Sequence, residues 1–125
     1  SSTLTDEGII VFQCKINILQ NIENLCLILV FKTTENIKLF TVSDIDHLHE
    51  LRRGENEILI ASSNNFFNSG KFKLDLHIVQ NNLHSLWYEE DFISFSVVKG
   101  TRKLGQWMGD RTGYIQPKFN WRLLE

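Results

Sequence analysis

The stretch Lys71-Phe72-Lys73-Leu74-Asp75-Leu76-His77-Ile78 decides the fold class, because its polar and apolar residues alternate without a break. Successive side chains of a β-strand point to opposite faces of a sheet, so a period of two is typical of a strand with one face in a core. The apolar face carries Phe72, Leu74, Leu76 and Ile78, and the polar face, turned to water or ligand, carries Lys73, Asp75 and His77.

Similar short apolar runs, separated by clusters of Asn, Ser, Gly and Asp, continue outward in both directions. Residues 25–31 differ, since they are apolar on both faces, which predicts a central strand covered on both sides or a strand in an oligomer interface. Residues 9–18 set Gln13, Lys15 and Asn17 against an apolar face. The candidate strands are residues 8–19, 25–32, 38–42, 57–61, 71–80, 92–98, 111–115 and 119–123.

About eight strands in this order predict an all-β fold, an antiparallel β-sandwich of the jelly-roll or immunoglobulin-like kind. The length of 125 residues suits a single domain over residues 1–125. The one helical pattern starts at Ser43, a residue type that caps helices, and stops before Gly54. It predicts one short helix or turn near residues 43–52.

The charge and hydropathy of the chain exclude several classes of protein. Its formal net charge is only −2, and Lys and Arg are spread along the chain, which argues against a nucleic-acid surface and favours a neutral or weakly charged ligand. The longest apolar run, residues 25–31, is far shorter than the roughly 20 residues of a membrane span. Cys14 and Cys26 lie in apolar segments, so we expect reduced core thiols, which favours the cytosol, although a bridge between adjacent strands is the alternative.

The first residues, Ser-Ser-Thr-Leu-Thr-Asp-Glu, contain no initiator Met and no signal-peptide pattern. We therefore expect the chain to be part of a larger protein.

No sequence motif for catalysis or for a cofactor is found. Phosphate-binding glycine loops, CxxC and HExxH are all missing. Glu89-Glu90-Asp91 is better explained as a charged hairpin turn than as a catalytic carboxylate pair, because adjacent residues do not face each other. On a short helix, acidic residues and histidines fan over different faces, so we expect a solvated surface and no metal at Asp44, Asp46, His47, His49 and Glu50.

Aromatic residues beside polar groups are the remaining feature. Trp87 and Tyr88 follow Asn81-Asn82 in an expected turn region, and Trp107 lies in the Gly-rich residues 105–110. Exposed rings stack on the C–H face of a pyranose while planar polar groups bind its hydroxyls; capping of the open ends of the sandwich is the alternative. We expect Trp121, which alternates with Phe119 and Leu123, to lie on a core face.

Two segments resemble the C-terminal glycan-binding domain of polysaccharide ABC-transporter ATPases of the Wzt type, which recognises O-antigen. Ile60-Ala61, followed by Asn65-Phe66-Phe67-Asn68-Ser69-Gly70-Lys71-Phe72-Lys73-Leu74-Asp75-Leu76, is similar to that family's "IP, then nxLxxGxYxlxl" signature. Residues 113–121, Gly-Tyr-Ile-Gln-Pro-Lys-Phe-Asn-Trp, resemble its closing "GxVxxPxxxW". Ala61 stands where the family usually has Pro and Phe72 where it often has Tyr, and the usual first strand is short or missing.

The resemblance implies a non-catalytic domain without a cofactor, which binds the non-reducing end of a bacterial polysaccharide before its export. It places the domain in the cytoplasm, at the cytosolic face of a Gram-negative inner membrane, with the ATPase domain upstream of Ser1. The partners that it implies are the polysaccharide, the transporter membrane subunit through the rest of the chain, and a second copy in a homodimer, in some members formed by exchange of a terminal strand.

The expected carbohydrate site lies on the half-polar sheet face, with loop aromatics as platforms. Two alternatives remain open: a structural or dimerisation module that pairs through residues 25–31, and an accessory sugar-binding domain of a glycan-processing enzyme. The expected carbohydrate-binding residues are Gln13, Lys15, Asn17, Lys73, Asp75, His77, Trp87, Tyr88 and Trp107.

Overall fold

A computed structural model of the chain describes residues 2–44, 51–81, 84–101 and 112–124. These residues form seven β-strands and no helix, in agreement with the predicted fold class. The strands are β1 (Ser2–Thr5), β2 (Val11–Ile18), β3 (Leu25–Thr33), β4 (Lys38–Ser43), β5 (Gly54–Ala61), β6 (Gly70–Gln80) and β7 (His84–Val98).

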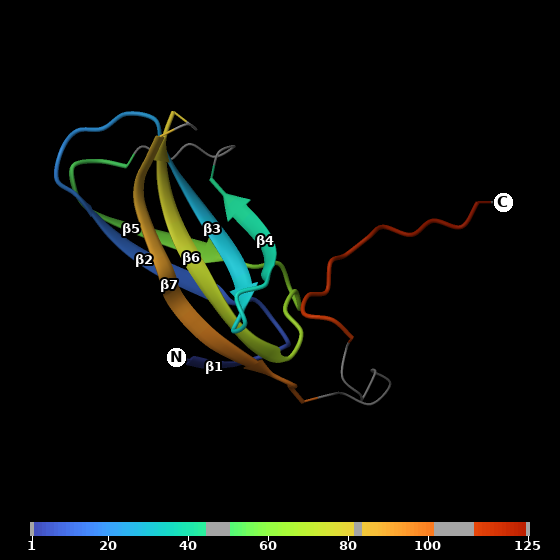
Figure 1. Cartoon of the computed structure of the whole chain (residues 1–125). Helices are drawn as coiled ribbons and strands as arrows, with labels where there is room; N and C mark the ends of the chain where they lie inside the picture. The colour runs from blue at the N-terminus through green and yellow to red at the C-terminus, as the bar shows by residue number, and fades with distance from the viewer. Residues whose placement is uncertain (1, 45–50, 82–83, 102–111, 125) are drawn as a thin grey trace.

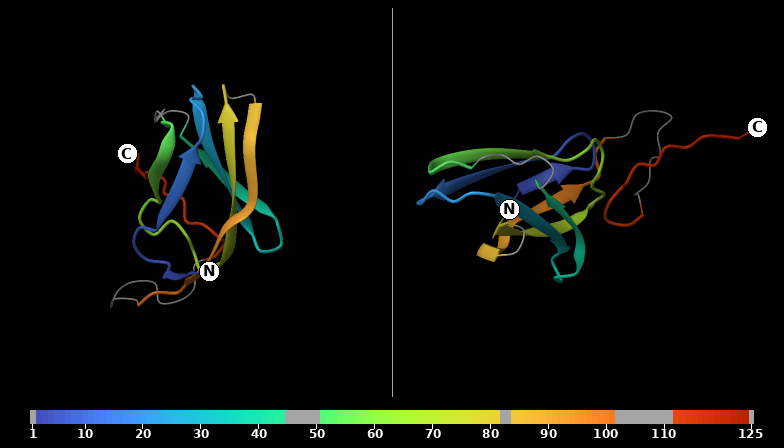
Figure 2. Two further views of the ribbon diagram at one scale, coloured as in Figure 1. Left: turned by 90° about the vertical axis from the view of Figure 1, so that its left-hand side faces the viewer. Right: turned by 90° about the horizontal axis from the view of Figure 1, so that it is seen from above.

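The strands form two sheets that pack face to face as a β-sandwich (Figures 1 and 2). The larger sheet has the order β1-β7-β6-β3-β4, and the smaller sheet pairs β2 with β5. All pairs are antiparallel except β1 with β7, which is parallel. The adjacency of β7, β6 and β3 in one sheet, opposite β2 and β5, matches the immunoglobulin scheme and favours it over a jelly roll.

Aromatic rings join the two sheets at the centre of the core. Phe12 of β2 lies edge-on to Phe31 of β3 and Phe95 of β7, with ring centroids 5.6 and 5.1 Å apart. Phe67, in the connection between β5 and β6, contacts both Phe12 and Phe72. Each buried Phe contributes about 1.5–3 kcal/mol through removal of its ring from water. The apolar face predicted for residues 71–78 is confirmed, since Phe72, Leu74, Leu76 and Ile78 are all buried.

Strand β3 is the central strand that its two-faced apolar pattern predicts. It lies between β4 and β6, and most of its side chains are buried. Cys14 and Cys26 are free and buried, which confirms the expected thiols. Burial raises the pKa of the Cys14 thiol. The pKa of Cys26 is raised to about 11, first by burial and then by its hydrogen bond to Asp44.

Strand β7 corrects the prediction around residues 84–91. The strand starts at His84 instead of residue 92, so Glu89-Glu90-Asp91 is not a hairpin turn and Trp87 and Tyr88 do not lie in a turn. The register between β6 and β7 shifts between Leu74 and Leu76, where Asp91 adopts a positive φ of 53°. A β-bulge of this kind allows the charged residues to remain within one long strand.

The C-terminal residues correct two further predictions. Residues 112–115 contribute only an isolated bridge between Ile115 and Phe67, and residues 119–123 form no strand. Trp121 is 93% exposed, so its expected place on a core face is wrong. Residues 119–124 are exposed, and this end of the chain extends away from both sheets (Figure 2). The helix or turn predicted near residues 43–52 falls mainly on residues 45–50, outside the described residues, and β1 was not predicted.

Candidate functional site

The expected site residues of β2 lie on the outer face of the smaller sheet. Gln13, Lys15 and Asn17 are exposed and alternate with buried residues. Each faces water beside a residue of β5, and Lys15 forms an ion pair of 3.5 Å with Glu57. Both side chains of that pair are more than half exposed, so it contributes little to stability.

The expected site residues of β6 lie on the outer face of the larger sheet. Lys73, Asp75 and His77 alternate with the buried residues that face β2 across the core. Because the inner faces of the two sheets meet, the polar faces of β2 and β6 point to opposite sides of the sandwich. The structure therefore separates the expected residues into two surfaces and does not bring them together in one.

Strand β7 adds one aromatic residue to the outer face of the larger sheet. Tyr88 is the cross-strand partner of His77, and their rings pack edge to face with centroids 4.4 Å apart. Trp87 is the partner of Ile78, which faces the core, so Trp87 lies on the other face of the strand, where it is 57% exposed. Trp107 lies outside the described residues.

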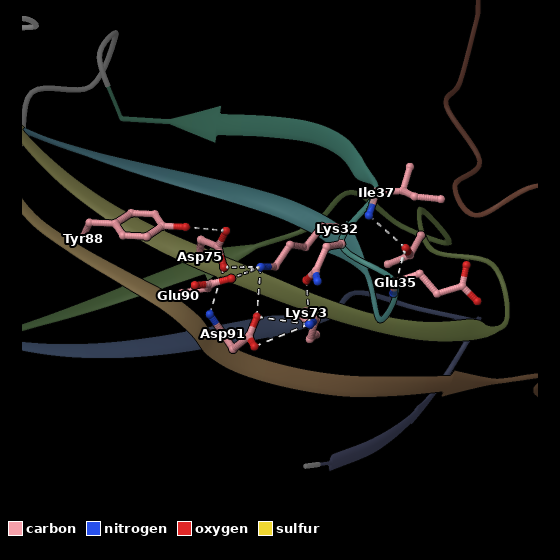
Figure 3. A network of polar contacts seen from close by, with 10 residues as sticks. Lys32, Glu35, Ile37, Lys73, Asp75, Tyr88, Glu90 and Asp91 are labelled. Atoms are coloured by element: carbon pink, nitrogen blue, oxygen red, sulfur yellow. Dashed lines mark hydrogen bonds and ion pairs between the residues drawn. The ribbon is translucent and has the colours of Figure 1, made fainter.

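A buried lysine lies at the centre of this outer face. The Lys32 ammonium is 2.9 Å from Asp75 Oδ1, 2.9 Å from Asp91 Oδ1 and 3.6 Å from Glu90 Oε1 (Figure 3). The side chains of Lys32 and Asp75 are each 4% exposed. One cation therefore joins β3, β6 and the bulge of β7 by charge-assisted hydrogen bonds.

The bulge itself is fixed by the same carboxylate. Asp91 donates its backbone N–H to Asp75 Oδ1 at 2.8 Å, and the Tyr88 hydroxyl donates to Asp75 Oδ2 at 3.1 Å. Asp75 thus accepts hydrogen bonds from a backbone amide, a phenol and an ammonium group. This arrangement aligns the Tyr88 ring over the sheet and turns the partly exposed carboxylate of Asp91 toward the network.

A second lysine extends the network toward the turn after β3. Lys73 donates a hydrogen bond of 2.8 Å to Asn36 Oδ1 and lies 3.3 Å from Asp91 Oδ1. Asn36 has a positive φ of 66°, which an Asn in a tight turn tolerates. The side chain of Glu90, 62% exposed, borders the network and leaves carboxylate oxygen facing water.

The network favours the charged forms of Lys32, Asp75 and Asp91. Burial alone disfavours the charged form of Lys32, but hydrogen bonds and charges from Asp75 and Asp91 outweigh it and raise the pKa of Lys32. Burial likewise opposes ionisation of Asp75, yet hydrogen bonds from the Asp91 amide and from Lys32 lower its pKa. The Lys32 hydrogen bond lowers the pKa of Asp91. Around neutral pH the face therefore holds two ionised Asp residues around a charged ammonium.

Sequence reasoning did not identify Lys32, Asn36, Glu90 and Asp91 as members of this group. Lys32 directly follows a long apolar run, and its phase places it on the face opposite Phe31. That phase alone does not show its partners, since they depend on the register of β3 against β6 and on a bulge. The run of acidic residues at 89–91 is the available indication, but such a run is more typical of a turn than of a strand.

A different kind of surface lies at the open side of the sandwich between β4 and β5. Neither strand has a partner on its outer edge among the described residues. A cavity of about 190 Å³ opens there. Its lining is mostly aromatic and apolar, from Phe31, Phe40, Val42, Ala61, Ser62, Ser63, Phe66 and Phe67.

The described residues show neither a cluster of His, Cys, Asp and Glu suited to a metal ion nor a helix that could cross a membrane. The expected solvated surface at Asp46, His47, His49 and Glu50 lies outside those residues.

No protein-family model and no curated protein matches the chain in sequence. Its fold is similar to a solved structure described as the crystal structure of the C-terminal domain of Wzt. The two share 18% sequence identity and superpose with a TM-score of 0.72 over 98% of this chain and 74% of that chain. The likeness establishes the fold of the chain as that of this β-sandwich.

Proposed function

We propose that the chain is a non-catalytic carbohydrate-binding module that recognises a bacterial surface polysaccharide for export. The observation that carries the proposal is the outer face of the larger sheet, where an exposed ring and planar polar groups lie side by side. The motif resemblance to O-antigen-binding domains and the likeness to the Wzt C-terminal domain support it. In that context the domain would act in the cytoplasm beside the transporter.

The site centres on Tyr88, whose half-exposed ring stands against His77. A pyranose ring that stacks on Tyr88 would place hydroxyl groups near the carboxylates of Glu90 and Asp91 and the ammonium of Lys73. Asp75 is buried, so it supports the site instead of touching the sugar. Trp87, on the other face of β7, would contact a polymer that passes over the free edge of the strand.

The β2 surface with Gln13, Lys15 and Asn17 is the weaker candidate for this role. It presents the isolated Lys15–Glu57 ion pair and exposed aliphatic residues such as Val11 and Leu59. No aromatic residue lies among the exposed residues of β2 and β5. We therefore assign the polysaccharide to the β6–β7 surface.

A titration of the purified chain with the O-polysaccharide of its source strain tests the proposed function. The control polymer lacks the non-reducing terminal residue, and binding is followed by calorimetry and Trp fluorescence. A site of this kind binds with a Kd of about 1 µM to 1 mM. Binding of the intact polymer alone supports recognition of a chain end. Equal binding of both favours an accessory domain of a glycan-processing enzyme, and no binding of either contradicts the proposal.

We also propose a homodimer, in which the C-terminal segment of one copy lies against the open side of the other. Phe119, Trp121 and Leu123 alternate along this segment and are 77%, 93% and 91% exposed. An extended segment with this spacing has one apolar face. It leads away from its own sandwich (Figure 1), so a second molecule is within its reach.

The open side has the features that such a segment requires. The core-facing Ile58 and Ile60 of β5 remain only half-buried, because no described strand covers the outer edge of β5. In the immunoglobulin scheme, a further strand lies at this position of the smaller sheet. An exchanged segment would pair with that edge and place apolar rings against the cavity between β4 and β5.

A further inference from the structure

Lys32 occupies a position that no polysaccharide reaches. It lies on the outer face of the larger sheet, yet Asp75, Asp91 and Glu90 surround its ammonium group and leave 4% of its side chain exposed. The aliphatic neighbours Val30 and Ile28 on the same face of β3 are half-buried. A lysine so covered acts on a ligand only through the groups that it holds.

The groups that Lys32 holds are those that shape the proposed site. Asp75 receives the Tyr88 hydroxyl and the Asp91 amide, and Asp91 in turn contacts Lys73. Without the ammonium group, Asp75 and Asp91 would be two neighbouring carboxylates that repel each other. The Asp91 amide in the bulge of β7 and the Tyr88 hydroxyl both donate to Asp75. Without Lys32, this shared acceptor would lose the positive charge that keeps it ionised.

We infer that Lys32 is the positioning residue of the polysaccharide site, because it holds Asp75 and Asp91 in the arrangement that orients Tyr88 and the bulge of β7. The inference rests on the proposed function. It adds a specific consequence: Lys32 fixes the pH range over which the site binds sugar. The buried carboxylate of Asp75 remains ionised at mildly acidic pH only while the ammonium group lies beside it.

The effect of Lys32 must be distinguished from the effects of other charged groups on this face. Lys38 of β4 is the direct cross-strand neighbour of Lys32 and is exposed, so it carries the same charge without the buried contacts. It provides a matched control for any variant of Lys32. The remaining charged or titratable side chains that the structure places around Lys32 are Lys73, Asp75, His77, Tyr88, Glu90 and Asp91.

The test compares Lys32→Met with Lys38→Met by titration with the same O-polysaccharide between pH 5 and pH 8. Each titration is made where the protein is folded by circular dichroism. We expect Lys38→Met to bind within about twofold of the unaltered chain, because Lys38 is exposed and lacks the buried contacts of Lys32. Lys32→Met should lose about tenfold in affinity at pH 8 and still more at pH 5, as the buried Asp75 takes up a proton.

An unchanged affinity and pH profile in Lys32→Met would overturn the inference and leave the proposed function intact. Absence of binding by the unaltered chain would instead refute the proposed function. If Lys32→Met does not fold, the double variant Lys32→Met/Asp75→Asn replaces it, because the amide removes the unpaired buried charge and its single oxygen still accepts from the Asp91 backbone amide. We expect weaker binding in that variant, and full affinity would overturn the inference.

Discussion

The ammonium group of Lys32 in β3 lies 2.9 Å from Asp75 Oδ1 in β6, and both side chains are 4% exposed. The two residues are far apart in sequence, and the pairing of β3 with β6 brings them together. Removal of one partner leaves the other charge unpaired. Such a loss costs about 3–5 kcal/mol where the remaining charge is left without a partner, and we expect about 2 kcal/mol here, because Asp75 keeps its hydrogen bonds from the Asp91 amide and the Tyr88 hydroxyl. Urea unfolding of Lys32→Met measures the change.

The double variant Lys32→Met/Asp75→Leu serves as the control for that measurement. With both charges replaced by apolar groups, only part of the loss should be recovered, because the Asp91 amide and the Tyr88 hydroxyl lose their acceptor. A single variant as stable as the unaltered chain would show that the pair does not contribute to the fold.

Acid should weaken the sandwich through Asp75 and Asp91. Burial opposes the ionisation of Asp75, but hydrogen bonds from the Asp91 amide and from Lys32 lower its folded-state pKa, and the hydrogen bond from Lys32 lowers that of Asp91, in both cases below the unfolded value of about 3.9. Their contribution to stability is therefore present above about pH 4 and is lost as the pH falls through their folded-state pKa. Unfolding free energies measured at several pH values between 6 and 2 give the slope.

In this acid series, Lys32→Met should show a shallower loss, because its carboxylates no longer prefer the ionised form in the folded state. The variant Glu57→Gln, at the exposed pair on β2, controls for general charge effects. Equal slopes for the unaltered chain and Lys32→Met would contradict this account of acid sensitivity.

Asn68 should control how firmly the C-terminal segment is attached. It is fully buried, and its Nδ2 donates to the carbonyl groups of Thr112, Gly113 and Ile115 at 3.0–3.2 Å. We expect Asn68→Ala to cost about 1–3 kcal/mol through lost buried hydrogen bonds. Hydrogen exchange at the amide of Gln116, which donates to the Phe66 carbonyl, should accelerate.

The matched control for this experiment is Asn120→Ala, at an exposed position of the same segment. It should leave both stability and exchange at Gln116 unchanged. Unaltered exchange in Asn68→Ala would show that other contacts hold the segment.

The proposed dimer depends on the apolar face of the C-terminal segment. Trp121→Ser should convert a dimer to a monomer, because Trp121 is 93% exposed within one copy and would be buried in the other. Sedimentation velocity measures the state of association. Leu19→Ser removes another strongly exposed apolar residue, at 76% exposure, and should leave the dimer intact. A monomeric unaltered chain would contradict the exchange.

Alternation along single segments was enough to predict the sandwich. The patterns of residues 71–78 and 9–18 show directly which side chains face the core, because a strand has a period of two. The uninterrupted apolar run of β3 likewise indicated a central strand. These features depend only on local sequence, which explains why they were predicted correctly.

The site could not be assembled in the same way. Nothing within β2 or β6 tells that Gln13 and Lys73 belong to opposite outer faces, since that depends on which sheet each strand joins. The partners of Lys32 depend on the register of β3 against β6 and on the bulge at Asp91. The alternation of Trp121 with Phe119 and Leu123 is that of a strand with a core face, but no described residues cover Trp121, and a local pattern does not show whether another element lies against it.

The most direct test of the account is a residue-by-residue map of polysaccharide binding by heteronuclear NMR. The O-polysaccharide of the source strain is added to the labelled chain, and changes in amide shifts are followed. We expect changes centred on His77, Tyr88 and Asp91, on the outer face of the larger sheet. Changes confined to Gln13, Asn17 and their neighbours on β2 and β5, or no changes at saturating polymer, would contradict it.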